Sequence, residues 1–409
     1  MTHICRVCES SKTKELISFG LQPNSMQLLD RCDQEYYEHD LTLEICLNCG
    51  FTFISDPMPA HFLYADFHWG TSTYPPSHLE DLCDTISHEF LQTQSDLIME
   101  IGSNDGYFLS RFRERNCENL LGVEPTKNCV QLSLERGVPT LNAFFGKQIA
   151  DEIITTHGRA TCIICRHVLE HVWDLEDFLN GVSTLLLDEQ SVFVLEVPDF
   201  HTIIDQGNFS SIWEQHVNYF DSFSLDKLLR RHSFDIFAKK IVPFAGNSIM
   251  LFARKNGQQG TDVQNNLNPD IFTKRKNIFK QKIENNIAEM HDFLSRLKSS
   301  GSTIAAYGAG MRGVCLVNFS RIYRYIDYFV DDDRRKLGKV IPKCMLEVRS
   351  PQVLYREGPE YCLITPLKDK ATEKQLQKNH LDYFKSGGRF IELFPEKSPN
   401  CIIVESNLR

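Results

Sequence analysis

The stretch DLIMEIGSNDGYFLSRFRER, residues 96–115, decides the fold class of this chain. Its first six residues are apolar enough for a buried parallel strand, a turn with a glycine at each end follows, and an amphipathic segment comes next. Strand, glycine turn and helix in this order form the first unit of a doubly wound α/β sheet. Glycine lets the backbone approach a ligand closely, and the helix N-terminus offers free N–H groups. We therefore expect a ligand site at this turn.

The turn has the pattern E-x-G-x-x-x-G, which differs from the dinucleotide pattern G-x-G-x-x-G. It resembles the form typical of class I methyltransferases that use S-adenosylmethionine (SAM). This resemblance implies that the turn and the acid before it hold the amino-acid end of SAM. The expected cofactor contacts are Glu100, Gly102, Asn104, Asp105 and Gly106.

The next strands bring further groups to the same edge of the predicted sheet. LLGVEP (120–125) ends in Glu124, whose carboxylate is placed to accept hydrogen bonds from both ribose hydroxyls. Glu124 could instead be an exposed carboxylate that caps the following helix. A third strand-like piece near 138–145 would place Phe144 or Phe145 beside the adenine.

Two more strands complete the alternation. Residues 161–172 (TCIICRHVLEHV) and 192–200 (VFVLEVPDF) form short apolar runs. His167 lies toward the carboxyl end of the first run, where open α/β sheets bind ligands, and we expect it to contact the cofactor. The sequence therefore predicts an α/β fold with a Rossmann-like methyltransferase core.

Four of the fourteen cysteines form two CxxC pairs, Cys5 with Cys8 and Cys46 with Cys49. Two such turns complete a tetrahedron of thiolates around zinc, and four sulfur ligands leave no open position, so the predicted zinc is structural. Accidental pairs or one redox dithiol are the alternatives. A thioredoxin-type site, however, needs a βαβ pattern that is absent here.

The segment 62–78 (FLYADFHWGTSTYPPSH) is dense in aromatic and hydroxyl side chains and shows little periodicity. Aromatic faces exclude water and hydroxyls supply directed hydrogen bonds, so this loop either covers a ligand or forms a packed linker. We expect Trp69 to contact the substrate.

Two segments carry histidines that suit acid–base chemistry. His167 and His171 in RHVLEHV stand four residues apart, but the string does not match the zinc motif H-E-x-x-H. The segment 210–225 (SSIWEQHVNYFDSFSL) mixes titratable groups with aromatic residues ahead of a helix and is a good catalytic candidate. An imidazole near neutral pH can remove a proton next to a carbonyl, as carbon methylation requires. Structural histidines and a hydrophobic cap are the alternatives.

The last third of the chain repeats a nucleotide-binding layout. Residues 257–270 are rich in turn formers and predict a linker, and a long amphipathic helix follows as a packing brace. TIAAYGAGMRGVCLVNF (303–319) predicts a strand, a glycine turn and a helix, and IDYFVDDD (326–333) predicts a second strand ending in acids. We expect Arg312 at the turn to contact a phosphate, with a simple surface role as the alternative.

In their order and spacing these strings resemble the three-part sugar C-methyltransferase family, whose members methylate a dTDP-linked 4-keto-sugar at carbon 3. The resemblance covers nearly the whole chain. It rests on the paired CxxC module, EIGSNDGYFL, GVEP, the segment 171–178, H-x-x-YF-x-x-x-SL, YGAGMRG and YFVDDDRRKLGK. It implies a SAM-dependent enzyme with structural zinc that acts on a sugar nucleotide between its last two domains.

The same resemblance implies roles in the catalytic segment. His171 and His216 match the family's active-site histidines, so we expect His216 to remove the proton while His171 and Gln215 stabilise the enolate. The family's Tyr-x-Glu-His becomes Trp213, Glu214, Gln215 and His216 here. Gln215 cannot ionise, and Glu214 can substitute only if the loop rotates.

Whole-chain properties limit partners and location. The formal net charge of −10 over 409 residues disfavours a nucleic-acid partner. No apolar run approaches the ~18 residues of a membrane-spanning helix and no signal segment is present, so we expect a cytoplasmic protein without membrane contact. The oligomeric state is left open, with a monomer as one option.

We therefore predict a zinc-binding module at 1–75, a methyltransferase domain at 76–256 and a C-terminal α/β domain at 257–409. The expected substrate contacts are Trp69, Trp213, Asn218, Tyr219 and Arg312. The rival functions are O- or N-methylation of a capsule, lipopolysaccharide or antibiotic sugar, and a non-catalytic partner that binds SAM or a nucleotide sugar.

Overall fold

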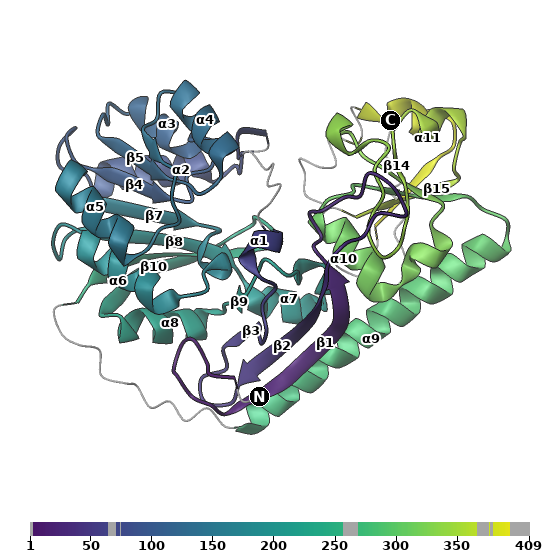
Figure 1. The fold of residues 1–409 in the computed structure, drawn as a ribbon, viewed down its shortest axis with the longest axis horizontal. Coiled ribbons are helices and arrows are strands. Elements are labelled where there is room, and N and C mark those ends of the chain that lie inside the picture. The colour runs from purple at the N-terminus through teal and green to yellow at the C-terminus, as the bar shows by residue number, and fades with distance from the viewer. Residues whose placement is uncertain are drawn as a thin grey trace.

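The computed structural model describes residues 3–63, 71–73, 75–256, 269–365, 376 and 379–392. These residues form three β-sheets with helices around them (Figure 1). The central and C-terminal sheets occupy opposite sides of that view, and the long strands β1 (Thr13–Pro23) and β2 (Glu38–Cys46) lie below and between them. Trp69, predicted to contact substrate, lies outside the described residues.

The central sheet has seven strands in the order β10-β11-β8-β7-β4-β5-β6. Their bounds are β4 (Ile98–Ile101), β5 (Leu120–Val123), β6 (Thr140–Leu141), β7 (Cys162–Arg166), β8 (Val192–Pro198), β10 (Phe234–Val242) and β11 (Ser248–Lys255). Strands β4 to β8 are parallel to one another. Strand β11 pairs antiparallel with both β8 and β10. This arrangement is a Rossmann-like α/β core, as the sequence predicted. The hairpin of β10 and β11 was not predicted.

Helices cover both faces of the central sheet. Side chains alternate along each strand between two apolar clusters, so that Met99 and Ile101 of β4 face one cluster and Ile98 faces the other. The helices are α2 (Leu79–Glu89), α3 (Tyr107–Arg113), α4 (Lys127–Glu135), α5 (Lys147–His157), α6 (Leu175–Leu185), α7 (Phe200–Gln206) and α8 (Ser222–Arg231). Burial on both faces explains why these strands are apolar runs rather than alternating patterns.

The strand within 161–172 was predicted to end at His167, and it ends within one residue of that position. β7 stops at Arg166, and His167 has a left-handed backbone with φ +53°. Because a side chain with positive φ does not fit an extended strand, the chain leaves the sheet here and forms the 3₁₀ helix η2 (Leu169–His171). His171 consequently lies beyond the sheet edge, after the end of the strand.

The N-terminal sheet takes a strand from the predicted methyltransferase domain. Its antiparallel order is β1-β2-β3-β9, where β3 is Thr52–Ile54 and β9 is Asn218–Tyr219. The short helices α1 (Ala60–Leu63) and η1 (Thr71–Thr73) follow β3. Because β9 belongs to the segment predicted to be catalytic, this sheet crosses the boundary predicted at residue 75.

The C-terminal sheet is parallel throughout, with the order β14-β13-β12-β15-β16. Its strands are β12 (Ile304–Tyr307), β13 (Tyr328–Val330), β14 (Val348–Arg349), β15 (Tyr361–Ile364) and β16 (Arg389–Glu392). The helices of this region are α9 (Pro269–Ser299), α10 (Met311–Ser320), η4 (Ile322–Tyr325), η5 (Arg334–Lys336), α11 (Val353–Arg356) and α13 (Leu381–Lys385). The strand, turn and helix predicted over 303–319 are therefore observed as β12 and α10.

The long helix α9 runs along β1 and the C-terminal domain (Figure 1) and also packs against α7. Its side chains Phe279 and Leu294 are buried in one apolar cluster with Leu16 of β1, Phe200 of α7 and Phe329 of β13. Burying an aromatic or leucine side chain contributes about 1.5–3 kcal/mol each. The predicted packing brace is confirmed.

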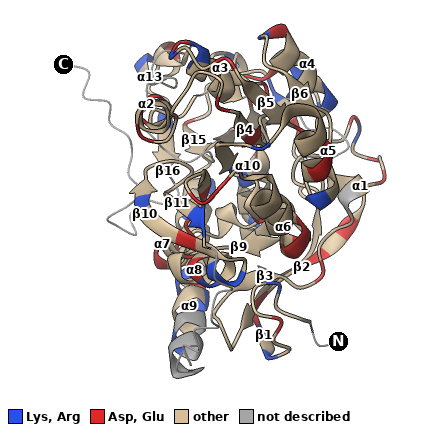
Figure 2. Cartoon of the chain, turned by 90° about the vertical axis from the view of Figure 1, so that its left-hand side faces the viewer, with Lys and Arg blue, Asp and Glu red and all other residues tan. Residues whose placement is uncertain are grey.

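The outer surface of the helices carries charges of both signs. Figure 2 marks acidic and basic residues close together along α5 and α8, as expected for helices whose opposite faces are apolar. Among the described residues, no helix combines the length and the apolar character needed to cross a membrane.

Candidate active site and metal cluster

The turn after β4 requires glycine for both conformation and packing. Gly102 and Gly106 have φ values of +69° and +70°, in the left-handed region that favours glycine. A Cβ at Gly102 would lie 2.2 Å from Val168 Cγ2, and a Cβ at Gly106 would lie 2.2 Å from Ser133 Oγ. The turn is thus held between α4 and the segment after β7.

Glu124 at the end of β5 holds the same turn through backbone hydrogen bonds. Its Oε2 accepts from Asn104 N at 3.0 Å, and its Oε1 accepts from Thr126 N at 2.8 Å. Burial raises the pKa of Glu124, and no Lys, Arg or His in the described chain forms an ion pair with it. Its carboxylate is therefore buried with its charge uncompensated, and the ribose contact stays a prediction.

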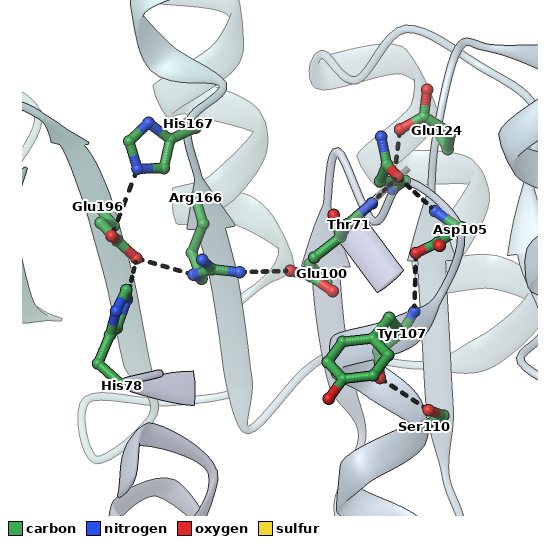
Figure 3. Close-up of polar contacts among 11 residues, drawn as sticks. Thr71, His78, Glu100, Asp105, Tyr107, Ser110, Glu124, Arg166, His167 and Glu196 are labelled. Atoms are coloured by element: carbon green, nitrogen blue, oxygen red, sulfur yellow. Dashed lines mark hydrogen bonds and ion pairs between the residues drawn. The ribbon is translucent and has the colours of Figure 1, made fainter. Parts of the chain in front are cut away.

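The 3₁₀ helix η1 lies against this turn (Figure 3). Thr71 N donates to Asn104 Oδ1 at 2.9 Å, and Ser72 N donates to Asp105 Oδ2 at 3.1 Å. The described part of the aromatic segment 62–78 therefore contacts the predicted cofactor turn. This contact favours the covering role over that of a plain linker.

A buried ion network lies beside the turn, at the carboxyl ends of β4, β7 and β8 (Figure 3). Arg166 Nε donates to Glu196 Oε2 at 2.8 Å, and Arg166 Nη1 lies 3.8 Å from Glu100 Oε1. His78 Nε2 lies 3.1 Å from Glu196 Oε2. Burial raises the pKa of Glu100 to about 8, although Arg166 opposes the shift. Glu100 Oε2 has no hydrogen-bond partner within the described ranges.

His167 belongs to this network. Its Nε2 lies 3.3 Å from Glu196 Oε1, and its Nδ1 lies 3.3 Å from Glu170 Oε1. Burial opposes protonation, but the two carboxylates raise the pKa of His167 to about 9, so the ring is an imidazolium at neutral pH. Both ring nitrogens therefore face carboxylates of the protein, and the cofactor contact predicted for His167 stays a prediction.

The two phenylalanines after β6 differ in exposure. Phe145 packs edge-on against Phe178 with ring centroids 5.3 Å apart, as part of the central core. Phe144 is 68% exposed. Of the two residues predicted beside adenine, Phe144 is therefore the more exposed, and its contact with adenine stays a prediction.

His171 and His216 come together from two separate segments. Their ring centroids lie 4.7 Å apart, and the Trp213 ring centroid lies 4.0 Å from that of His216. His171 Nδ1 lies 2.9 Å from the backbone oxygen of Gln215. A carbonyl oxygen only accepts, so Nδ1 carries the hydrogen and Nε2 of the neutral ring carries the lone pair.

His216 is a buried imidazole without a hydrogen bond to its ring from any described residue, and only 6% of it is exposed. Burial, and then the nearby His171, lower the pKa of His216 well below the ordinary value. The ring is consequently neutral at neutral pH and offers a lone pair as a base.

The histidine pair lies at the same sheet edge as the cofactor turn. β4 and β7 are parallel neighbours, with Ile101 paired to Cys165. The residues that follow the two strands, 102–106 and 166–171, therefore leave the sheet side by side. This topology brings the predicted cofactor site next to the predicted base.

Glu214 and Gln215 point toward the N-terminal module. Glu214 Oε1 accepts from Ser25 N at 2.8 Å and from Ser25 Oγ at 2.7 Å, and Gln215 Nε2 donates to Leu63 O at 3.1 Å. The sequence predicted that Gln215 stabilises an enolate and that Glu214 replaces the family glutamate. Glu214 Oε1 and Gln215 Nε2 anchor the loop to the module, and the roles predicted for these two residues stay predictions.

Asn218 and Tyr219 also hold the loop rather than present free polar atoms. Asn218 Nδ2 donates to Leu169 O at 3.1 Å and to Val172 O at 2.6 Å, and its Oδ1 accepts from Arg6 Nη1 at 3.0 Å. The Tyr219 hydroxyl accepts from the backbone N–H of Trp213 at 3.2 Å. The structure gives their polar atoms partners inside the protein, and the substrate contact predicted for both residues stays a prediction.

Arg312 extends from the start of α10 toward the catalytic loop. Its Nη2 donates to Ser211 Oγ at 2.6 Å and lies 3.4 Å from Ser210 Oγ, both in the 3₁₀ helix η3 (Phe209–Ser211). Its Nε has no partner, and no carboxylate of the described chain pairs with it. Burial lowers the pKa of Arg312 to about 10, so the guanidinium stays charged at neutral pH.

The four paired cysteines converge as predicted. Cys5 Sγ lies 3.5 Å from Cys49 Sγ, Cys8 Sγ lies 3.6 Å from Cys46 Sγ, and all four sulfur atoms lie within 4.8 Å of one another. Thiolates at Zn–S distances of ~2.3 Å in a tetrahedron stand ~3.8 Å apart. The donor set and its spacing are therefore compatible with zinc.

Sequence reasoning missed the buried pair of Arg166 and Glu196. Both interrupt apolar strands, and the register of the sheet places them directly opposite each other. A charged residue at matching positions near the ends of two neighbouring strands was the available signal. Ser25, which binds Glu214, gave no such signal because its partner lies in a distant part of the sequence.

Comparisons with known proteins agree with this architecture. A profile described as the C-methyltransferase C-terminal domain matches residues 245–395, and a methyltransferase domain profile matches residues 77–239. The C-methyltransferase NovU of Streptomyces niveus is 27% identical over 418 residues, covering 99% of this chain and 98% of that protein.

Two solved structures cover smaller parts of the chain. A SAM-dependent methyltransferase from Anabaena variabilis has a TM-score of 0.33 and 14% identity, over 43% of this chain and 84% of its own. The magnesium protoporphyrin IX methyltransferase of Synechocystis with bound SAH has a TM-score of 0.34 and 12% identity, over 47% and 90%.

Proposed function

Because the chain is a SAM-dependent methyltransferase of the C-methyltransferase family, we propose that it methylates a carbon next to the ketone of a nucleotide-linked keto-sugar. The observation that carries this proposal is His216, a buried imidazole whose ring has no hydrogen bond to any described residue. Carbon methylation needs a base, because the carbon becomes nucleophilic only after it loses a proton. An oxygen or nitrogen acceptor has a lone pair already and depends less on such a group.

His216 is the proposed base. Its lowered pKa keeps the ring neutral at neutral pH, so its lone pair can take the proton next to the carbonyl. His171 Nε2 carries a lone pair as well and is suited to accept a hydrogen bond from a sugar hydroxyl. In this arrangement it orients the substrate rather than donating to an enolate.

SAM is the proposed cofactor at the turn of residues 102–106. Glu100, with its unpartnered Oε2, would hold the cationic amino end, and Glu124 would accept hydrogen bonds from the ribose. When bound, SAM supplies an electrophilic methyl group on its sulfonium. The backbone at Gly102 and Gly106, shaped by positive φ values, would allow close approach.

Arg312 is the proposed contact for the diphosphate of the sugar nucleotide. A guanidinium with an unpartnered Nε and no carboxylate partner in the described chain has unused donors and uncompensated charge. Phosphate oxygens match both needs. Its position beside η3, close to the catalytic loop, supports a substrate that reaches from the C-terminal domain to His216.

A zinc ion at Cys5, Cys8, Cys46 and Cys49 is the proposed structural metal. Arg6, between the first two cysteines, donates to Val217 O at 2.9 Å and to Ile54 O at 3.1 Å. Since Val217 directly follows the proposed base, the metal module would stabilise the loop that carries His216. Its chemistry is structural, because four sulfur ligands leave no position for substrate.

The test replaces His216 with Asn and measures methyl transfer from SAM to dTDP-linked 4-keto-sugars. Methyl transfer should fall roughly 10²–10⁴-fold, as expected when a general base is lost, while SAM affinity measured by calorimetry stays nearly the same. His157→Asn, at an exposed histidine, serves as the matched control. A carbon-13 methyl label read by NMR identifies the acceptor. A methyl carbon bound to oxygen or nitrogen, or unchanged turnover in His216→Asn, would overturn the proposal.

A further inference from the structure

A second set of metal-ligating side chains lies apart from the cysteines: Glu170, His171 and His216. One carboxylate oxygen and one nitrogen of each imidazole all lie within 4.8 Å of one another. Two of the residues are in η2 and the third is in the loop before β9. Asn218 ties these two segments together by donating to Leu169 O at 3.1 Å. The fold therefore creates this cluster from parts of the chain that are distant in sequence.

The cluster has unused ligand capacity. Glu170 is 1% exposed, its Oε1 lies at ion-pair distance from His167 Nδ1, and its Oε2 has no hydrogen bond in the described chain. The ring of His216 likewise has no hydrogen bond to any described residue. Buried polar groups without partners are unfavourable, and a carboxylate is the most unfavourable of them. Glu170 Oε2 and a His216 ring nitrogen therefore leave ligand atoms available to a further positively charged partner.

Neighbouring groups already orient these side chains. His171 Nδ1 donates to the backbone oxygen of Gln215 at 2.9 Å, which fixes the lone pair on Nε2. Glu170 Oε1 lies 3.3 Å from His167 Nδ1, and the carboxylate has a second oxygen beyond that contact. Metal-ligating histidines typically donate their other nitrogen to a carbonyl or carboxylate in this way. The surroundings are therefore those of a supported ligand set.

We propose that Glu170, His171 and His216 bind a divalent transition-metal ion such as Zn²⁺ or Co²⁺. Imidazole and carboxylate ligands select this class of ion over Mg²⁺ and Ca²⁺, which take oxygen ligands. Ligands ~2.1 Å from one ion stand about 3.4 Å apart in a tetrahedron. Movements below about 1 Å would bring the three groups from their present spacing to that geometry. With three protein ligands, one coordination position stays open, unlike the cysteine cluster.

An ion at this site would inhibit the enzyme. This consequence rests on the proposed function, in which His216 uses its lone pair to remove a proton. A metal ion occupies the same lone pair, so the base and the metal ligand are mutually exclusive states of one side chain. The methyltransferase would therefore lose activity at metal concentrations that fill the second site, while the structural cluster is already saturated.

The test uses the full chain loaded with one zinc per molecule, titrated with cobalt chloride. We expect a second equivalent of metal by elemental analysis, with visible absorption of cobalt in nitrogen and oxygen coordination and no added sulfur-to-cobalt charge transfer. Glu170→Gln and His171→Asn should each weaken this second binding at least tenfold. Glu152→Gln, at an exposed carboxylate on α5, is the matched control and should bind cobalt as the wild type does.

In the same titration, the metal concentration that halves methyl transfer should match the cobalt dissociation constant, and both should shift together in Glu170→Gln. Absence of a second equivalent in the wild type, or equal affinity in Glu170→Gln and wild type, would overturn the site. Bound cobalt with unchanged turnover would overturn the inhibition. The cobalt measurement does not depend on catalysis, so a chain that methylates no keto-sugar would refute the proposed function and still decide the metal site.

Discussion

The central and C-terminal sheets each carry a glycine turn after their first strand, and the two turns are built alike. In the central sheet, Glu124 at the end of the second strand accepts from Asn104 N at 3.0 Å. In the C-terminal sheet, Asp331 takes the same position and its Oδ2 accepts from Ala309 N at 2.8 Å. In both sheets, an acid from the second strand fixes the turn that follows the first.

The two acids differ in their charge environment. Asp331 Oδ2 lies 2.9 Å from Lys336 Nζ, so its charge is compensated within the domain. Glu124 has no such partner in the described chain, and burial raises its pKa. An acid at this position therefore does not by itself indicate a nucleoside ligand. The uncompensated one marks the turn that still needs donors from outside the protein, and this favours the central turn as the cofactor site.

Replacing Glu124 and Asp331 should give the largest difference between the two turns, measured as SAH affinity. Glu124→Ala removes the acceptor for the turn and for the proposed ribose hydroxyls, so SAH affinity should fall roughly 100-fold, since two hydrogen bonds to a charged group are worth about 1.5–3 kcal/mol each. Asp331→Ala should leave SAH affinity within about twofold. Because the two hydrogen bonds together amount to about 3–6 kcal/mol, the 100-fold loss for Glu124→Ala is the lower bound. Calorimetry with SAH measures both variants. Equal losses in the two variants would show that the effect comes from general destabilisation.

Arg312 tests the other half of the comparison, because it follows the C-terminal turn. Arg312→Ala should raise the KM for the sugar nucleotide roughly tenfold or more, since it removes a charge-assisted contact, and should leave SAH affinity unchanged. Arg312→Lys should recover part of the loss by restoring the charge without the fork of donors. Initial-rate kinetics at saturating SAM gives the values. A change in SAH affinity instead of KM would assign Arg312 to the central site.

The same pair of turns shows what the sequence could and could not predict. The sequence predicted a strand, a turn and a helix at both turns. The periodicity of apolar residues and the spacing of glycines are properties of a short stretch of chain, so they can be recognised without the fold. The cysteine cluster was predicted for the same reason, from two CxxC turns. The sequence did not predict that Lys336 compensates the charge of Asp331 while no described cation compensates Glu124. This difference depends on which side chains the tertiary structure brings next to each acid.

The catalytic loop shows the same limit more clearly. A family resemblance predicted that His171 and His216 belong to one active site. In the fold their ring centroids lie 4.7 Å apart. Glu214 contacts Ser25, 189 positions away in the sequence, and Asn218 contacts Arg6, 212 positions away. No periodic pattern encodes such pairings. The sequence therefore did not predict that Glu214 and Asn218 hold this loop in place.

Glu100 sharpens the comparison through pH. Its pKa of about 8 means that the carboxyl is mostly protonated at pH 7 in the ligand-free protein. If it holds the cationic amino end of the cofactor, binding requires the ionised form, so SAH affinity should rise with pH by up to about tenfold per unit until pH 8 and then level off. Glu100→Gln should lose this dependence. Calorimetry from pH 6 to 9 measures it, and subtracting the variant's profile removes the titration of the ligand itself. Identical profiles in both proteins would exclude Glu100 from the cofactor contact.

Replacing one glycine in each turn should give the smallest expected effect, a difference in the stability of the folded protein. Gly106→Ala would force a side chain onto a φ of +70° with its Cβ 2.2 Å from Ser133 Oγ, which should destabilise the central domain by about 1–3 kcal/mol. Gly310, which precedes α10, has a φ of −93°, and a Cβ there meets no described atom within 4 Å. Gly310→Ala should therefore change stability by less than about 0.5 kcal/mol. Thermal unfolding followed by circular dichroism should show a lower midpoint only for Gly106→Ala. A comparable loss in Gly310→Ala would mean that the C-terminal turn is as tightly constrained as the central one, and the distinction between the two turns would then rest on charge alone.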